Sequence, residues 1–206
     1  PKWAELGAYE FIEQKKKEGK IRNIGFSFHA DKELLEEILS SHHWDFCQLQ
    51  INYLDWHNGD AKDLYDLTVK YDVPVMVMEP VRGGYLSAFA PAVEAPMKAC
   101  HPELSVSAWA LRWVASLKNV AIVLSGMSNM QQMQDNVKTF TNFQPMTEEE
   151  YQVIDTVLKE LDKIKPIPCT GCRYCMDCPN GVDIPAAFTA YNDYKKTENK
   201  ELIHNR

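Results

Sequence analysis

Short apolar runs alternate with amphipathic segments along most of the chain, and this alternation limits the folds that the chain can adopt. Four runs of strand length lie at 21–28, 46–51, 73–78 and 120–124. The third, VPVMVM, has the continuous apolar character of a strand that is buried on both faces. Strands that alternate with helices form parallel βα units. We therefore predict an α/β fold built on four parallel strands.

The segments around these strands carry apolar residues at helical spacing. We expect helices at 7–19, 31–39, 64–71, 106–117, 130–140 and 147–161. Asp31 should cap the second helix, and Thr147 with Glu150 should form a capping box on the last. The stretch 91–103, PAVEAPMKACHPE, is interpreted as a long connection. Trp109 with Trp113 and Met130 with Met133 are expected to pack in the core.

Two architectures fit four βα units: a small doubly wound sheet, or half of an eightfold βα barrel, which typically needs about 250 residues. In both, function should lie on the segments that follow the strands. These are SFHA, NYLDW, EPVRGGYL and SGMSN. The prolines of KIKPIP indicate a boundary. We predict one domain at 1–164 and a second at 165–206.

Composition narrows the classes of partner and location. The chain has 206 residues, of which 45% are hydrophobic and 25% charged, with a formal net charge of −7. This charge argues against nucleic acid or an anionic membrane as a partner. The sequence has no apolar run that could span a bilayer, and it opens without the pattern of a secretory signal. We expect a cytoplasmic protein, and an upstream segment before Pro1.

Four cysteines follow one another at intervals of two residues near the end of the chain. They are Cys169, Cys172, Cys175 and Cys178, and Pro179 comes next. The run is close to the ferredoxin pattern that holds a [4Fe–4S] cluster, with a last spacing one residue shorter. A zinc site would separate its two pairs more widely, and disulfides would need an oxidising compartment. We predict a [4Fe–4S] cluster on these four thiols.

Two further cysteines lie outside this loop. Cys47 falls in a predicted strand and Cys100 in the predicted connection, and both are interpreted as buried structural thiols. One of them is the alternative fourth cluster ligand if Cys178 lies out of reach.

The order of several motifs resembles that of a known family. The matching segments are GKIRNIGFS, FCQLQINYLDW, VPVMVMEPVRGGYL, ALRWVAS, VLSGMSN with DNV, and CTGCRYCMDCPNGVDIP. They resemble the C-terminal portion of the aldo/keto reductases, in the branch with a ferredoxin-like tail. The resemblance implies the last four βα units of a (β/α)8 barrel, followed by a small helical iron–sulfur appendage. It also implies hydride transfer between a nicotinamide cofactor and a small carbonyl or alcohol substrate.

The resemblance also suggests which residues bind the dinucleotide. Ser27 and Gln48 match the residues that contact the nicotinamide carboxamide, backbone amides from Glu79 to Gly84 match the pyrophosphate loop, and SGMSN with the following helix matches the adenosine end. The cofactor residues implied are Ser27, Gln48, Glu79, Pro80, Arg82, Gly83, Gly84, Gly126, Gln132, Asp135 and Asn136. Gly126 and Gln132 stand where a basic residue would grip a 2′-phosphate, so the choice between NAD and NADP stays open.

The family's catalytic Asp, Tyr, Lys and His belong to its first four strands, and no position of this chain matches them. We therefore name no catalytic residue and expect the chain alone to be inactive. Among the histidines, His29 is the best placed, since it follows the Ser27 strand. Two alternatives to a reductase remain: an iron–sulfur electron-transfer or binding module with an electron partner, and a cluster that only staples the C-terminal helices.

Overall fold

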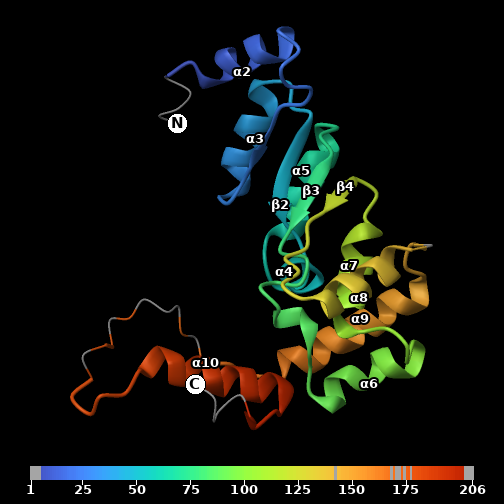
Figure 1. Ribbon diagram of the computed structural model, residues 1–206, viewed down its shortest axis with the longest axis vertical. Coiled ribbons are helices and arrows are strands. Elements are labelled where there is room, and N and C mark those ends of the chain that lie inside the picture. The colour runs from blue at the N-terminus through green and yellow to red at the C-terminus, as the bar shows by residue number, and fades with distance from the viewer. Residues whose placement is uncertain are drawn as a thin grey trace. The chain divides into compact units, whose positions relative to one another are not determined.

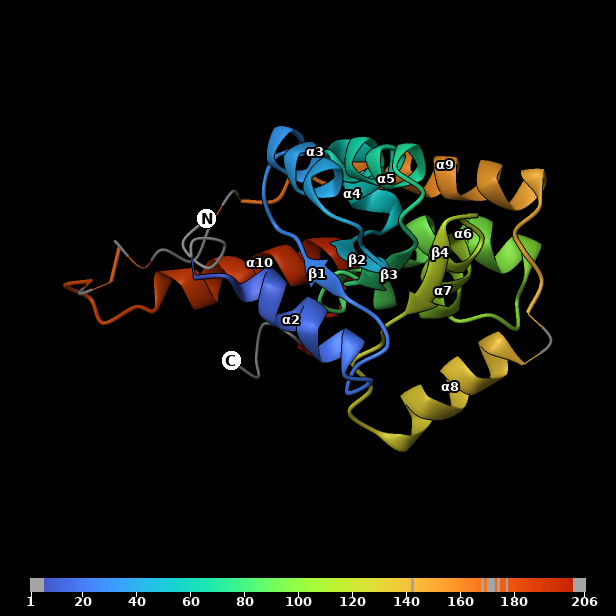
Figure 2. The same ribbon diagram turned by 90° about the horizontal axis from the view of Figure 1, so that it is seen from above.

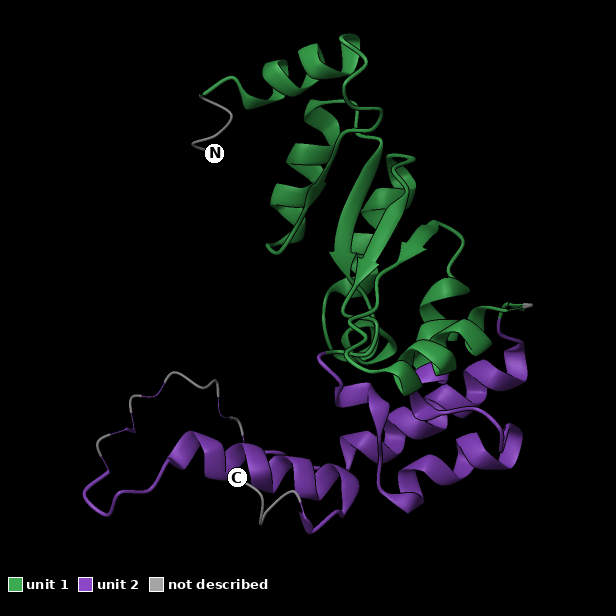
Figure 3. Cartoon of the chain, in the orientation of Figure 1, with its two compact units in different colours: residues 1–82, 110–145 green, residues 83–109, 146–206 purple. Residues whose placement is uncertain are grey.

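The computed structural model describes residues 6–141, 143–167, 169, 173, 175–176 and 178–201. Its contacts divide the chain into two compact units, 1–82 with 110–145 and 83–109 with 146–206 (Figure 3). Both units are discontinuous in sequence, since each takes two separate stretches of chain. The domains predicted at 1–164 and 165–206 are continuous segments of sequence, whereas these units are defined by contacts. The boundary after residue 164 therefore stays a prediction.

The first unit is built on a parallel sheet, as the sequence predicts. Its strands are β1 (Gly25–Ser27), β2 (Phe46–Gln50), β3 (Val75–Met78) and β4 (Val120–Val123), in the order β1-β2-β3-β4 (Figure 2). Ser27 pairs with Gln48, and Gln50 with Met78. All three pairings are parallel, so the carboxyl ends of the strands lie at one edge of the sheet. This architecture is consistent with part of a (β/α)8 barrel.

The helices of this unit come before, between and after the strands. They are α2 (Ala8–Lys17), α3 (Lys32–Ser41), α4 (Tyr53–Asn58), α5 (Ala61–Lys70) and α8 (Met130–Phe140), while α7 (Val106–Ala115) is shared with the second unit. Helix α5 packs on β2 and on α3. Asp31 caps α3 as predicted, because its Oδ1 accepts a hydrogen bond of 3.0 Å from the backbone N–H of Leu34. The short helix α4 was not expected, since six residues are too few to show helical periodicity.

A partly exposed ion pair joins α2 to the segment between α3 and β2. Lys16 Nζ lies 2.5 Å from Asp45 Oδ2, and the same oxygen accepts a hydrogen bond of 2.7 Å from the backbone N–H of Ile24. The hydrogen bond from Lys16, followed by that from Ile24, lowers the pKa of Asp45. Helix α2 ends ahead of Gly19, whose φ of 71° continues the chain in the left-handed region, as the sequence predicts.

The two faces of the sheet differ in exposure. Cys47 and Leu49 of β2 are buried with Val75 and Val77 of β3, whereas alternate residues such as Met76 are only half-buried. The expectation that 73–78 is buried on both faces is therefore wrong. Buried and half-buried residues alternate along β3, as they do in a strand with one face more fully covered than the other. Burial raises the pKa of the Cys47 thiol to about 12, as befits a structural cysteine.

The apolar stripe of α8 is exposed, contrary to the expectation that it packs in the core. Met130, Met133, Val137 and Phe140 keep 69%, 44%, 56% and 40% of their surface exposed. Periodicity correctly predicted that these side chains share one helix face, but it carries no information on whether another element covers that face. Trp109 and Trp113, at 0% and 5%, are core residues as predicted.

In the second unit, a helix replaces the connection predicted at 91–103. Helix α6 (Pro91–Cys100) packs on α9 (Glu148–Asp162), which begins with the predicted capping box of Thr147 and Glu150. Pro91 occupies the first turn, where proline is tolerated, and Val93 and Met97 are buried one turn apart. Pro96 lies inside the helix, where it removes a backbone hydrogen bond. Because two prolines in ten residues are typical of a loop, the sequence did not predict this helix. Cys100 is the last residue of α6 and is half-buried rather than buried.

Helix α10 (Ile184–Thr197) begins after its N-cap Asp183 and carries Pro185 in its first turn. Lys196, which is 7% exposed, donates a hydrogen bond of 3.0 Å to the backbone oxygen of Tyr85, the first residue of the 3-10 turn η1 (Tyr85–Ser87). Its ammonium also lies 4.5 Å from the centre of the Tyr85 ring. Burial lowers the pKa of Lys196. Helix α10 therefore docks on the segment that begins at residue 85.

The ribbon of the chain can be followed from end to end in Figure 1. Among the described residues, every helix is too short or too polar to cross a lipid bilayer. The cytoplasmic location stays a prediction.

Gly25 is required where β1 and β2 meet. A Cβ added at Gly25 would lie 2.5 Å from both the ring and the backbone oxygen of Phe46. We expect Gly25→Ala to lower the free energy of unfolding by about 1–3 kcal/mol, because backbone must shift to relieve the contact. Urea denaturation measures the change. Gly126→Ala is the control, since no described atom lies within 4 Å of its Cβ; equal loss in both variants would contradict the explanation.

Candidate functional site

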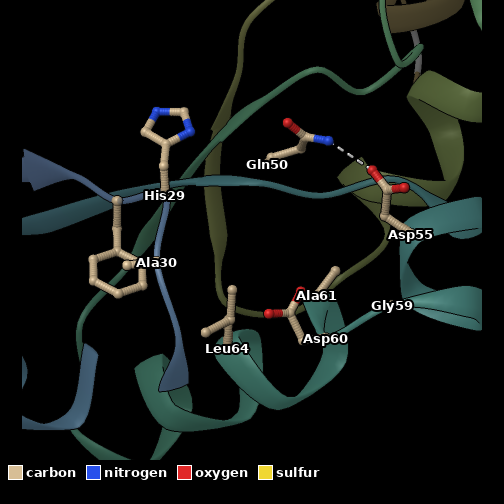
Figure 4. A pocket seen from close by; sticks show the side chains of 9 residues that line it. His29, Ala30, Gln50, Asp55, Gly59, Asp60, Ala61 and Leu64 are labelled. Carbon is tan, nitrogen blue, oxygen red and sulfur yellow. Dashed lines mark hydrogen bonds between the residues drawn. The ribbon is translucent and has the colours of Figure 1, made fainter. Parts of the chain in front are cut away.

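A cavity of about 310 Å³ opens in the first unit beside the carboxyl ends of β1 and β2 (Figure 4). It is lined by Phe28, His29, Ala30, Gln50, Asp55, Gly59, Asp60, Ala61 and Leu64. Two carboxylates, an imidazole and an amide thus face one hollow with several apolar side chains. In parallel α/β sheets, ligands bind at this end of the strands. The cavity is therefore a candidate part of a binding site.

Ser27 and Gln48 meet at this end of the sheet. Gln48 Nε2 lies 3.5 Å from Ser27 Oγ and 3.4 Å from Met78 Sδ. Ser27 Oγ in turn lies 3.3 Å from His29 Nε2. Parallel pairing of the two strands produces this juxtaposition, since Ser27 and Gln48 are directly opposite in register. A hydroxyl and a side-chain amide in contact can together donate to and accept from one planar polar group.

The turn that follows β3 is held in an unusual backbone conformation. Glu79 and Arg82 have φ values of 55° and 49°, and Gly83 and Gly84, which begin the second unit, have 59° and 86°. The backbone N–H of Arg82 donates a hydrogen bond of 2.9 Å to the oxygen of Glu79, and Pro80 between them is buried. Left-handed backbone at a residue other than glycine costs of order 1–3 kcal/mol and gathers at functional sites.

Five polar groups connect this turn to the end of β2. Asp55 Oδ2 accepts hydrogen bonds of 2.8 Å from Gln50 Nε2 and from Asn52 Nδ2, while Arg82 Nε lies 2.7 Å from Asp55 Oδ1. Asn52 Nδ2 also donates at 3.1 Å to the backbone oxygen of Glu79. Sequence analysis singled out the segment NYLDW but named neither Asn52 nor Asp55. The signal available was the Asn-x-x-Asp spacing of a helix cap placed directly after a strand.

The remaining predicted residues lie after β4. Gln132 Oε1 accepts a hydrogen bond of 2.7 Å from the backbone N–H of Ser128, and Asn136 Nδ2 donates at 2.8 Å to Ser125 Oγ. These contacts fold the loop that contains Gly126 onto α8. Asp135 lies on the same helix between them. The structure thus gathers this group on α8 and its loop, and it gathers Ser27 with Gln48 at the ends of β1 and β2.

The cysteine loop is described in part. Cys169 and Cys175 are exposed and Cys178 is half-buried, whereas Cys172 lies outside the described residues. Backbone hydrogen bonds from Val182, Asn180 and Gly181 lower the pKa of Cys178. Within the described part of the chain, no group of three or more His, Cys, Asp or Glu side chains is placed to hold a metal ion.

Comparison with known proteins gives a family and a fold. A model described as the Aldo/keto reductase family matches residues 2–159. A search of curated proteins found no match. Among solved structures, the holo form of aldo-keto reductase AKR11C1 from Bacillus halodurans is similar at 27% identity with a TM-score of 0.55, covering 70% of this chain and 53% of that one.

A second solved structure agrees with this fold. An aldo-keto reductase from Klebsiella pneumoniae in complex with NADPH has 20% identity and a TM-score of 0.58, covering 73% of this chain and 52% of that one. At this identity the likeness concerns the fold alone. The chain thus spans about half the length of these solved relatives.

Proposed function

The chain belongs to the aldo/keto reductase family, and on this basis we propose that it supplies the dinucleotide-binding part of an oxidoreductase. The reaction would transfer hydride between a nicotinamide cofactor and the carbon of a small carbonyl or alcohol. The observation that carries the proposal is the contact between Ser27 and Gln48 at the strand ends, with the left-handed turn 79–84 following the next strand. Both features match the family's cofactor residues in type and order.

Each of these residues would have a defined task. The Ser27 hydroxyl and the Gln48 amide would hold the nicotinamide carboxamide, which fixes the face of the ring. Backbone amides of the 79–84 turn would bind the diphosphate, since amides exposed by left-handed turns form anion-binding sites. Arg82, whose side chain is 44% exposed, would add a charge-assisted contact. The loop with Gly126, and Gln132, Asp135 and Asn136 on α8, would hold the adenosine.

The bound dinucleotide would supply or accept the hydride, and the residues named here would orient it. Reduction of a carbonyl adds hydride to carbon and a proton to oxygen, so a proton donor is also needed. The family's donor residues match no position of this chain, and we propose that the chain alone does not turn over substrate. Because neither Gly126 nor Gln132 carries a positive charge, the proposal makes no choice between NAD and NADP.

We propose further that Cys169, Cys172, Cys175 and Cys178 hold a [4Fe–4S] cluster. The C-x2-C-x2-C spacing, the terminal proline and the amides that point at the Cys178 sulfur support this proposal. Cluster binding would also order this loop, since metal ligands commonly reach their final arrangement as the metal binds. The cluster could pass electrons to a partner or could hold α10 in place.

The binding of a reduced dinucleotide and of ADP-ribose tests the proposed dinucleotide site. We expect the chain to bind NADH or NADPH, and Gln48→Ala to weaken that binding about tenfold, the effect of one lost hydrogen bond to a polar group. ADP-ribose lacks the nicotinamide ring, so its affinity should be the same for wild type and variant. Ligand fluorescence and calorimetry measure both constants.

Ser40→Ala is the matched control, because Ser40 is exposed on α3 and its hydroxyl donates to its own helix. The proposal is wrong if the wild-type chain binds none of these ligands. It is also wrong if Gln48→Ala weakens ADP-ribose as much as NADH.

A further inference from the structure

We propose that Asn52 and Asp55 are positioning residues that hold the 79–84 turn in its left-handed conformation before any ligand arrives. The inference rests on the proposed function, because it concerns the turn that would bind the diphosphate. It adds that the shape of this turn is imposed by Asn52 and Asp55, at the start of α4, each of which contacts a residue 27 positions later in the chain.

Asn52 uses both its amide oxygen and its amide nitrogen. It is 0% exposed. Its Oδ1 accepts a hydrogen bond of 2.9 Å from the backbone N–H of Asp55, and its Nδ2 donates to Asp55 Oδ2 and to the backbone oxygen of Glu79. Only a side-chain amide both accepts one bond and donates two in this arrangement. Asn52 therefore joins the cap of α4 to the first residue of the turn.

Asp55 binds the other side of the turn. Its two oxygens accept from Arg82 Nε, Gln50 Nε2 and Asn52 Nδ2 at 2.7 to 2.8 Å. The carboxylate side chain is 20% exposed, so the ion pair with Arg82 is partly shielded from water. Contact through Nε fixes the plane of the guanidinium as well as its position. A carboxylate repels phosphate, so Asp55 acts on the diphosphate through Arg82 and is not itself a ligand.

The two residues that this network holds are the two non-glycine residues of the turn with positive φ. Glu79 is held at its backbone oxygen and Arg82 at its side chain. The backbone strain at both positions persists because the surrounding hydrogen bonds determine the conformation. A turn that is ordered in advance loses less conformational entropy when it binds an anion. Asn52 and Asp55 therefore raise affinity without touching the ligand themselves.

Hydrogen exchange and binding test this inference separately. Asp55→Ala should accelerate amide exchange in the peptide that contains residues 79–84 by about tenfold in the absence of ligand, since the contact that holds Arg82 is lost. The same variant should weaken the binding of NADH and of ADP-ribose equally, by about tenfold, because both ligands carry the diphosphate. Asn52→Ala should act in the same direction. The matched control is Asp63→Ala, an exposed carboxylate on α5 that removes the same charge.

The outcomes separate the inference from the proposed function. Unchanged exchange at 79–84 in Asp55→Ala overturns the positioning role, as does equal acceleration in Asp63→Ala. A wild-type chain that binds neither NADH nor ADP-ribose overturns the proposed function, whatever the exchange shows. If Asp55→Ala does not fold, Arg82→Gln breaks the same contact from the exposed partner, and unchanged exchange in that variant also overturns the inference.

Discussion

Replacing Cys175 with alanine is expected to lower the iron bound after anaerobic reconstitution from about four atoms per chain to near zero. A [4Fe–4S] cluster is held by cysteine thiolates, and Cys175 is the third of the four closely spaced thiols that would hold it. The side chain of Cys175 is exposed, so its thiol is accessible to iron and sulfide. Iron and acid-labile sulfide assays, with the visible absorption of the protein, measure the loss.

Cys100→Ala is the control for this experiment, because Cys100 ends helix α6 and lies outside the loop. This variant should retain iron, sulfide and colour at the wild-type level. Loss of the cluster in Cys100→Ala would instead make Cys100 the remote fourth ligand. A wild-type chain that takes up zinc but no iron would show that the loop is a zinc site.

Replacing Leu49 with alanine is expected to lower the free energy of unfolding by about 2–5 kcal/mol. Leu49 lies in β2, between β1 and β3, and is 1% exposed. Truncation removes buried methyl groups and leaves a cavity that the surrounding β-sheet and helices cannot fill without moving. Urea denaturation followed by circular dichroism measures the change.

Leu124→Ala removes the same atoms from a leucine that follows β4 and is 38% exposed. It should cost less than about 1 kcal/mol, because its side chain already contacts water. Similar losses in the two variants would show that Leu49 is not the core residue that its burial indicates.

The order of strands and helices was predictable because apolar periodicity depends on local sequence. Prediction from periodicity failed where the local pattern was interrupted or did not contain the information needed. Pro91 and Pro96 concealed α6, and the stripe on α8 showed which side chains share a face but not that Met130 is 69% exposed. Exposure depends on which element lies opposite, and no window of sequence around residue 130 contains that element.

Some residues of the candidate site were likewise predicted from the sequence, and others were found only in the folded chain. Ser27 and Gln48 were identified through the resemblance to a family, and strand pairing does place them in contact. Asn52 and Asp55 were not named, although the segment NYLDW was expected to carry function. Their partners Glu79 and Arg82 lie in a different loop, so only the folded chain reveals that these four residues form one network.

The described sheet has a strand order that follows the order of synthesis. β1, β2, β3 and β4 are neighbours in sequence and in space, so each strand can join the sheet beside the one made just before it. A chain emerging from the ribosome folds its N-terminal part first. Asn52 and Asp55 are made before residue 79, and the end of β2 can therefore be in place when the strained turn emerges. The 79–84 turn is therefore expected to form its contacts with Asn52 and Asp55 after the end of β2 has folded.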